Sequence, residues 1–303
     1  MINTIDGILT AAKELKGGVI AVAAAHDDVT LQAVVDAKRS GIAESVLVGH
    51  ENEIRAILAE LGESPNDYRI IDADTDQDCA KAAVQEVRAG RASFLMKGLL
   101  GTADLMRAVL DRENGLRTNN LVAHCMLHET PSYPRMFIVT DGGVNTFPEL
   151  AQKADILENA ARILQALGYE QISAACVCGA ENVNPKIQAT VDAAALADMK
   201  DRWALYNMSV YGPVGLDLAV SPEACEHKGY HARGAGEADI ILAPDYQAGN
   251  GISKAASLFG GARTAGIILG AKAPIVLVSR SDSSDSKLAS IALGGLLAHR
   301  MQL

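Results

Sequence analysis

The sequence predicts an α/β protein with mainly parallel sheets. Short runs of Val, Ile and Leu alternate with helical patterns along almost the whole chain. Continuous apolar runs are typical of strands buried on both faces of a parallel sheet, and their alternation with helices indicates βαβ units. The length of 303 residues is enough for two domains of about 150 residues each.

Ten apolar runs are the predicted strands: 19–24, 45–49, 69–73, 92–98, 121–127, 135–141, 172–178, 239–244, 266–270 and 274–279. Eight stretches between them have helical patterns: 28–40, 51–62, 77–90, 103–113, 148–167, 185–198, 250–260 and 284–300. Ten strands are many for one sheet, so we expect two domains, with a first boundary near the polar segment 111–120. The Gly- and Ala-rich segment 212–239 is expected to be a loop with one short helix, which could form the wall of a cleft.

The composition argues against several classes of function. A net charge of −10 is unsuited to nucleic-acid binding, which needs basic residues, although a few local arginines could still hold an anionic substrate. The N-terminal stretch 1–18 lacks a long apolar core, and no run approaches the roughly 18 apolar residues of a membrane span. Five cysteines without a CxxC pair fit a cytoplasmic protein with reduced thiols.

The last predicted strand ends in a group of polar side chains, at the edge where α/β sheets bind ligands. These are Ser279, Arg280, Asp282 and Asp285. An arginine and carboxylates packed against the end of a buried strand are costly without a partner. A carboxylate could accept a proton. The alternative is that Ser284 or Asp285 only caps the final helix and that Arg280 is a surface charge.

Three other strand ends could approach an anion through backbone N–H groups. They are MKGLLGT (96–102), TDGGVN (140–145) and QAGNGISK (247–254). Each has a purely structural alternative. The first could be a connection in which Thr102 caps the next helix, the second a turn, and the third a loop with a cap.

The remaining cysteines and histidines, and the lack of nucleotide-binding motifs, argue against a metal site and against nucleotide binding. Cys176 and Cys178 have no further thiol or histidine nearby in the sequence, so a core position is favoured over a zinc site. His124 and His128 lie on a predicted strand without an acidic partner in register. A P-loop, a GxSxG elbow and a GxGxxG fingerprint after a strand are all lacking. Cys125 as a nucleophile stays open, although its predicted strand is apolar.

Several ordered motifs carry a family resemblance. They are 238–293 (ADIILAPDYQAGNGISK through SRSDSSDSKLASIAL), 95–110 with GLRT at 115–118, VTDGGVN at 139–145, ENVNP at 181–185, and GP…LD…HKG at 212–229. The chain resembles the phosphate acetyl/butyryltransferase family, and most of all its phosphate butyryltransferases, from about residue 17 onwards. Gln247, Ser253 and Tyr211 depart from the family pattern, which bears on the acyl-chain preference.

The resemblance implies the reversible reaction of acyl-CoA and phosphate to acyl phosphate and CoA, with a butyryl or similar short acyl group. It also implies two α/β domains of the isocitrate-dehydrogenase-like kind, residues 1–118 with 270–303 and residues 119–269, with the active site in the cleft between them. Coenzyme A would be a substrate, and neither a metal nor another cofactor is implied. A homodimer or higher homo-oligomer is expected, without nucleic-acid or membrane partners.

The resemblance also assigns roles to residues. With these substrates, the guanidinium of Arg280 suits two phosphate oxygens, and the hydroxyl of Ser279 could stabilise the oxyanion by about 3 kcal/mol. By analogy with the acetyltransferases the general base follows the Ser279–Arg280 pair, with Asp285 the first choice and Asp282 the second. Lys97, Thr102 and Arg107 match the family's KG…T…R/K pattern and are expected to contact phosphate or CoA. The other expected substrate contacts are Gly98, Thr140, Asn145, Gly249, Asn250 and Lys254, with Asn250 and Lys254 in a loop that could close on the anion.

Three other functions stay open. The first is a phosphate acetyltransferase. The second is a metal- and nicotinamide-dependent decarboxylating dehydrogenase on the same architecture, but the aspartates it would need are only the scattered Asp141, Asp217 and Asp239. The third is a non-catalytic sensor of CoA or acyl phosphate, against which the complete set of catalytic candidates argues.

Overall fold

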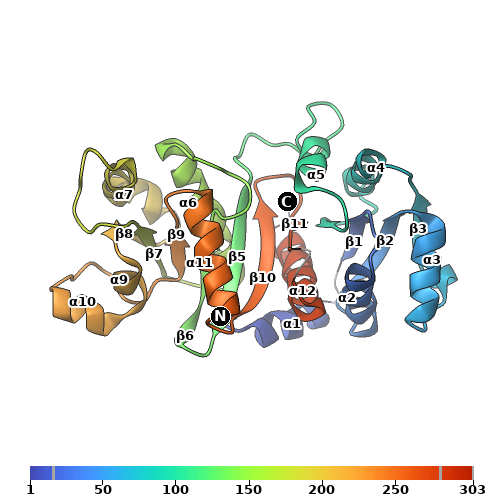
Figure 1. Cartoon of the computed structure of the whole chain (residues 1–303), viewed down its shortest axis with the longest axis horizontal. Coiled ribbons are helices and arrows are strands. Elements are labelled where there is room, and N and C mark those ends of the chain that lie inside the picture. Colours follow the sequence, from blue (N-terminus) through green and yellow to red (C-terminus); the bar gives the residue numbers. More distant parts are fainter. Residues whose placement is uncertain (16–17, 280–281, 302–303) are drawn as a thin grey trace. The chain divides into compact units, whose positions relative to one another are not determined.

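The computed structural model describes residues 1–15, 18–279 and 282–301, which form two compact units (Figure 1). We call them, by their place in the sequence, the flanking unit and the central unit. The flanking unit contains Ile5–Asn120 and Ala265–Leu303, and the central unit contains Met1–Thr4 and Leu121–Thr264. The flanking unit is therefore assembled from segments near both ends of the chain.

The strands of the flanking unit lie in the order β3-β2-β1-β4-β11-β10. Their bounds are β1 (Val19–Ala23), β2 (Glu44–Gly49), β3 (Arg69–Asp72), β4 (Phe94–Lys97), β10 (Arg263–Leu269), which begins at the boundary between the units, and β11 (Ile275–Val276). All neighbours in this series are parallel except β10 and β11. The carboxyl ends of β1, β4 and β11 consequently meet at one edge of the sheet.

The helices of the flanking unit form two packed groups. They are α1 (Ile5–Glu14), α2 (Asp28–Arg39), α3 (Glu51–Glu60), α4 (Asp76–Arg88), α5 (Thr102–Val109) and α12 (Ser284–Met301), with the 3₁₀ helix η1 (Pro65–Asp67). α12 packs against α1 and α2, whereas α4 packs against α5 (Figure 1). A Cβ atom on Gly294 would lie 2.8 Å from the ring of Phe94, so glycine lets α12 sit directly on β4.

The central unit has the strand order β5-β6-β9-β7-β8. Its strands are β5 (Ala123–Thr130), β6 (Tyr133–Thr140), β7 (Ile172–Val177), β8 (Met208–Val214) and β9 (Ile240–Leu242). Its helices are α6 (Leu150–Ala166), α7 (Gln188–Asp198), α8 (Lys200–Ala204), α9 (Leu216–Val220), α10 (Pro222–Lys228) and α11 (Tyr246–Leu258). Only the hairpin of β5 and β6 is antiparallel, and the other neighbours are parallel.

The predicted α/β class with mainly parallel strands is confirmed, and each predicted strand and helix has a counterpart in the structure. The expectation for segment 212–239 was wrong, because its first residues belong to β8 and two short helices follow. The Gly212–Pro213 pair disguised this strand, which tolerates proline because β8 is the last strand of the series. Helices α1 and α8 were also missed. Within the described ranges, no helix combines the length and apolarity needed to span a bilayer.

Candidate active site

Three of the predicted site residues line one small pocket at the carboxyl ends of β1, β4 and β11. The pocket has a volume of about 10 Å³, roughly the space of one water molecule. Its lining consists of Asp27, Thr30, Lys97, Gly98, Leu99, Val278, Ser279 and Lys287. The structure thus brings Lys97, Gly98 and Ser279 together, as expected from their positions after parallel strands, and adds a carboxylate and a second amine.

Lys97 ends β4 and is only 6% exposed. Its Nζ donates hydrogen bonds to the carbonyl oxygens of Gly98 at 3.0 Å and Leu100 at 3.1 Å. The next residue, Gly98, is pressed against the end of β1, where a Cβ atom would lie 2.1 Å from the carbonyl oxygen of Ala24. Only glycine fits there, so the amine of Lys97 is held on a rigid turn beside the pocket.

Ser279 and Asp282 form a closed turn after β11. The backbone N–H of Ser279 donates to Oδ2 of Asp282 at 2.8 Å, and the N–H of Asp282 donates to the carbonyl of Ser279 at 3.1 Å. The side chain of Asp282 is therefore engaged in shaping this turn. Arg280, the predicted phosphate ligand, lies outside the described residues.

Asp285 is exposed in the first turn of α12. The alternative that Ser284 or Asp285 caps this helix was wrong, because Ser283 does so. Its Oγ accepts a hydrogen bond from the N–H of Ser286 at 3.2 Å, three residues on, as an N-cap does. The carboxylate of Asp285 is consequently not used as a cap.

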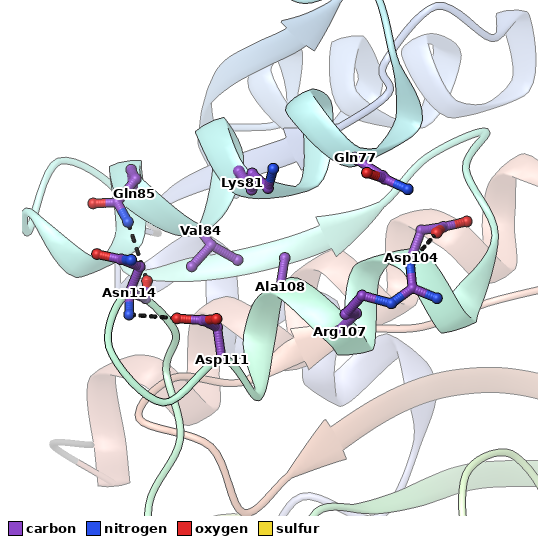
Figure 2. Close-up of a pocket in the computed structure, with 9 residues that line it drawn as sticks. All are labelled: Gln77, Lys81, Val84, Gln85, Asp104, Arg107, Ala108, Asp111 and Asn114. Atoms are coloured by element: carbon purple, nitrogen blue, oxygen red, sulfur yellow. Dashed lines mark hydrogen bonds and ion pairs between the residues drawn. The ribbon is translucent and has the colours of Figure 1, made fainter.

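Arg107 and Thr102 lie on α5, away from the lining of the Lys97 pocket. Thr102 is the first residue of α5 and Gly101 is its N-cap, so the structural alternative in which Thr102 caps this helix was wrong. Arg107 is exposed and forms an ion pair with Asp104 at 2.7 Å. Figure 2 shows Asp104 and Arg107 in a second pocket, of about 200 Å³, which is lined by α4 and by residues from Asp104 to Asn114.

In the central unit, the loop after β6 is organised around the buried carboxylate of Asp141. Oδ1 accepts hydrogen bonds from the N–H groups of Gly143 at 2.7 Å and Val144 at 2.8 Å. Oδ2 accepts from the N–H of His124 at 3.1 Å and from Nδ2 of Asn145 at 2.7 Å. Asn145, which we expected to contact substrate, thus has an internal hydrogen bond that holds the loop.

Two further predicted contacts of the central unit also make internal bonds. The hydroxyl of Thr140 is buried and donates to the carbonyl of His124 at 2.8 Å. Nδ2 of Asn250 donates to the carbonyl of Gly142 at 3.2 Å. A Cβ atom on Gly249 would lie 2.5 Å from the carbonyl oxygen of Asp141, so glycine permits the close approach of these two segments.

The prediction that Asn250 and Lys254 lie in a loop was wrong. Both are within α11, which begins at Tyr246 and is capped by the carboxylate of Asp245, the acceptor of the Ala248 N–H at 3.0 Å. Gly249 and Gly251 lower the helix propensity of this stretch and hid its first turn from the sequence pattern.

Cys125 cannot serve as a nucleophile at neutral pH. It is fully buried in β5, and burial raises the pKa of its thiol to about 12. Cys176 and Cys178 are buried as well, as predicted for core positions. Among the described residues, no group of three or more His, Cys, Asp or Glu side chains could hold a metal ion.

Sequence reasoning missed Lys287, whose amine lines the Lys97 pocket. Lys287 is only 3% exposed, although lysine is rarely buried. A signal was available, because Lys287 precedes Ile291 by four residues and Gly294 by seven. It therefore lies on the buried face of the predicted helix, where a lone charged residue is unexpected.

Comparison with known proteins gives consistent results over nearly the whole chain. Residues 76–294 match the family described as "Phosphate acetyl/butaryl transferase". Phosphate butyryltransferase of Clostridium acetobutylicum is 40% identical over 298 residues, which is 98% of this chain and 99% of the relative. Phosphate acetyltransferase of Thermotoga maritima is 41% identical over 283 residues, 93% of this chain and 96% of the relative.

Among solved structures, a branched-chain phosphotransacylase from Enterococcus faecalis is similar, with a TM-score of 0.81 and 31% sequence identity. The similarity covers 93% of this chain and 99% of that one. The family match spans parts of both units and includes Lys97, Ser279 and Lys287 of the Lys97 pocket. The chain therefore belongs to the phosphate acetyl/butyryl transferase family.

Proposed function

We propose that this protein catalyses the reversible reaction of acyl-CoA and phosphate to acyl phosphate and CoA, with butyryl or a similar short acyl group. Family membership supports the reaction class. The observation that carries the proposal is the common pocket of Lys97 and Ser279 at the carboxyl ends of parallel strands. A cation and a hydroxyl donor side by side suit two anionic substrates and a developing oxyanion.

In the direction that forms acyl phosphate, a phosphate oxygen attacks the thioester carbonyl carbon, the C–S bond breaks, and CoA leaves as a thiol with the proton that phosphate gives up. The ammonium of Lys97 supplies positive charge near the incoming phosphate. The hydroxyl of Ser279 donates a hydrogen bond to the tetrahedral oxyanion. An acyl-enzyme intermediate is not required, because holding two reactants in register supplies much of the rate enhancement. Coenzyme A enters as a substrate, and we assign no metal or redox cofactor to the reaction.

Arg280 and Asp285 complete the proposed set of active-site residues. Arg280 would grip two phosphate oxygens with its planar guanidinium. Arg280→Lys keeps the charge but loses the two-pronged contact, so the phosphate KM should rise while the KM for acyl-CoA stays nearly constant. An unaltered phosphate KM would remove Arg280 from the site. In the reverse direction Asp285 would accept the thiol proton of CoA, a role that fits its exposed position in the first turn of α12.

The deciding experiment mixes the purified protein with butyryl-CoA, with and without phosphate, and follows thiol release. Release that requires phosphate and is lost in Ser279→Ala supports the proposal. Equal release without phosphate would indicate a thioesterase instead. Reduction of NAD with a 2-hydroxy acid would indicate the dehydrogenase, and binding without turnover would indicate a sensor.

The acyl chain is the finer part of the proposal. We expect a preference for short unbranched groups of about three to five carbons, since one methylene in an apolar pocket shifts specificity by about 1–3 kcal/mol. The values of kcat/KM for acetyl-, propionyl-, butyryl- and isobutyryl-CoA decide between the chain lengths. A strong preference for acetyl-CoA would favour a phosphate acetyltransferase, the activity named for the Thermotoga maritima relative.

We also propose that the protein is a homodimer or a larger homo-oligomer. The central unit exposes several large apolar side chains around a hollow of about 750 Å³ between α6 and α7. Phe147, which is 69% exposed, lines this hollow, and the exposed Ile187 and Tyr246 adjoin it in sequence. Light scattering should give at least twice the chain mass of 31.8 kDa, and Phe147→Glu should lower it. A monomer at all concentrations would contradict the proposal.

A cytoplasmic location completes the proposal. All five cysteines are free, as expected in a reducing compartment. Fractionation of the source cells, with antibody detection of the protein in the cytosolic fraction, tests this location.

A further inference from the structure

The buried amine of Lys287 lies beneath the turn that carries Ser279. Its Nζ donates to the carbonyl oxygen of Asp282 at 2.7 Å and is 3.4 Å from the carbonyl oxygen of Ser279. The backbone N–H of Lys287 donates to the carbonyl of Ser283, so the lysine belongs to the first turn of α12. One side chain thus connects the rigid helix to both ends of the Ser279–Asp282 turn.

The surroundings of the amine are polar but largely closed to water. The charged groups that face it are Asp282 from the same turn, Asp27 after β1 and Lys97 at the end of β4. Burial lowers the pKa of Lys287, and the carboxylates of Asp282 and Asp27 oppose this effect. Asp27 is itself held by α2, because its Oδ2 accepts hydrogen bonds from the N–H of Thr30 at 2.9 Å and from its hydroxyl at 2.5 Å.

We propose that Lys287 is a positioning residue, whose ammonium holds the carbonyls of Ser279 and Asp282 and thereby sets where Ser279 meets the substrates. The proposal rests on the proposed acyl transfer. Lys287 itself acts through the turn and does not contact the reacting atoms. A displacement of a reactive group by about 1 Å can cost about 100-fold in rate, so loss of this anchor should appear in kcat.

The alternative is that Lys287 serves only the packing of α12. A packing role predicts lost stability without a specific change at the turn. A positioning role predicts a local change at Ser279 and Asp282, together with a lower kcat at nearly constant KM for acyl-CoA. These two roles are separable, because the hydrogen bonds that join Ser279 and Asp282 can be followed independently of activity.

The test compares Lys287→Met, which keeps the apolar stem without its donors, with Lys287→Gln, which restores two N–H donors on a shorter side chain. Lys13→Met, at an exposed lysine of α1 in the same unit, is the matched control. Thiol release with phosphate and butyryl-CoA gives kcat and KM. Hydrogen exchange of the Ser279 and Asp282 amides reports the turn directly, whether or not turnover occurs.

We expect Lys287→Met to lower kcat about 100-fold, to change the KM for acyl-CoA less than threefold, and to speed exchange at the two amides at least 10-fold. Lys287→Gln should recover part of the kcat and part of the protection of the two amides, and Lys13→Met should resemble the wild type. The wild-type advantage over Lys287→Met should shrink at alkaline pH, beginning below the 10.5 of an ordinary lysine.

Unchanged amide exchange and a kcat within twofold of the wild type would overturn the proposal. A uniform rise in exchange throughout the flanking unit, without recovery in Lys287→Gln, would also overturn it in favour of packing. If the wild type shows no phosphate-dependent release, the proposed function fails. The local exchange at Ser279 and Asp282 then still decides whether Lys287 holds the turn.

Discussion

Nδ2 of Asn145 lies 2.7 Å from Oδ2 of Asp141, so a residue expected to bind substrate is tied to a buried carboxylate. The same carboxylate accepts three backbone N–H groups. In this loop, the side chain of Asp141 fixes the backbone, and the backbone in turn determines which groups after β6 face a ligand.

Asp141→Ala should lower the free energy of unfolding by about 3 kcal/mol, because one buried donor and three partly buried donors lose their acceptor. Asp141→Asn, which keeps one acceptor oxygen, should lose less. Urea unfolding of both variants measures the difference, and Asp198→Ala at an exposed position of the central unit is the control. A loss below about 1 kcal/mol for Asp141→Ala would show that water replaces the carboxylate.

Cys125→Ala should retain kcat within about twofold. Burial raises the pKa of its thiol to about 12, so too little thiolate is present at pH 7 for nucleophilic catalysis. The thiol-release assay with butyryl-CoA and phosphate measures kcat. A thiol reagent should leave Cys125 unmodified in the native protein and modify it after denaturation. A drop of more than 10-fold in kcat, with unchanged stability, would return this cysteine to the mechanism.

His128 should make the protein less stable in acid. It is fully buried in β5, stacks on Phe137, and burial lowers its pKa to about 4 from the ordinary 6.5. Between these two values the unfolded chain binds a proton and the folded chain does not. Stability should therefore fall as the pH drops from about 6.5 to about 4, by up to about 3 kcal/mol from this residue.

Urea unfolding of the wild type and His128→Gln at pH 7.5, 6.5, 5.5 and 4.5 tests this expectation. The variant should lose less stability across the acidic range than the wild type. The exposed His231→Gln, also in the central unit, should follow the wild type. Parallel curves for the wild type and His128→Gln would mean that other groups cause the acid loss.

Asp285→Asn should cut kcat for the acyl phosphate plus CoA direction by about 100-fold at pH 7, as loss of a general base does. The deficit should shrink as the pH rises past about 8.5, where a thiol ionises without help. Asp282→Asn should instead raise the KM for phosphate in the direction from acyl-CoA and phosphate, without rescue by alkali, because Asp282 accepts the N–H of Ser279 and so shapes the turn. Exchange of these two phenotypes between the variants would reverse the assigned roles.

The sequence predicted the strand ends well because burial dictates them. Lys97, Gly98 and Ser279 follow continuous apolar runs, and parallel pairing brings such ends to one edge. The functions of individual polar groups were less predictable. The Asn145 amide could bind a ligand or hold its own loop, and only the fold places Asp141 at 2.7 Å from it.

The errors have physical causes. β8 carries a Gly–Pro pair that marks a turn in most contexts, yet the last strand of a series can accommodate it. The sequence pattern placed the start of α11 four residues too late, because Gly249 has poor helix propensity. In the fold, this glycine permits the close approach of α11 to the backbone of Asp141. Lys287 was missed because its burial depends on hydrogen bonds to two backbone carbonyls, and the sequence does not show that these carbonyls are its partners.

The flanking unit consists of two segments that are far apart in the sequence, and this has a consequence for synthesis on the ribosome. β11 pairs with β4 on one side and β10 on the other, and α12 packs on β4, but β11 and α12 are translated after the whole central unit. Almost all of the central unit emerges before them, so it can fold during translation as a continuous domain. The pocket of Lys97 is complete only after Ser279 and Lys287 have emerged from the ribosome. Truncation after residue 264 therefore leaves an open edge on β4 that invites aggregation.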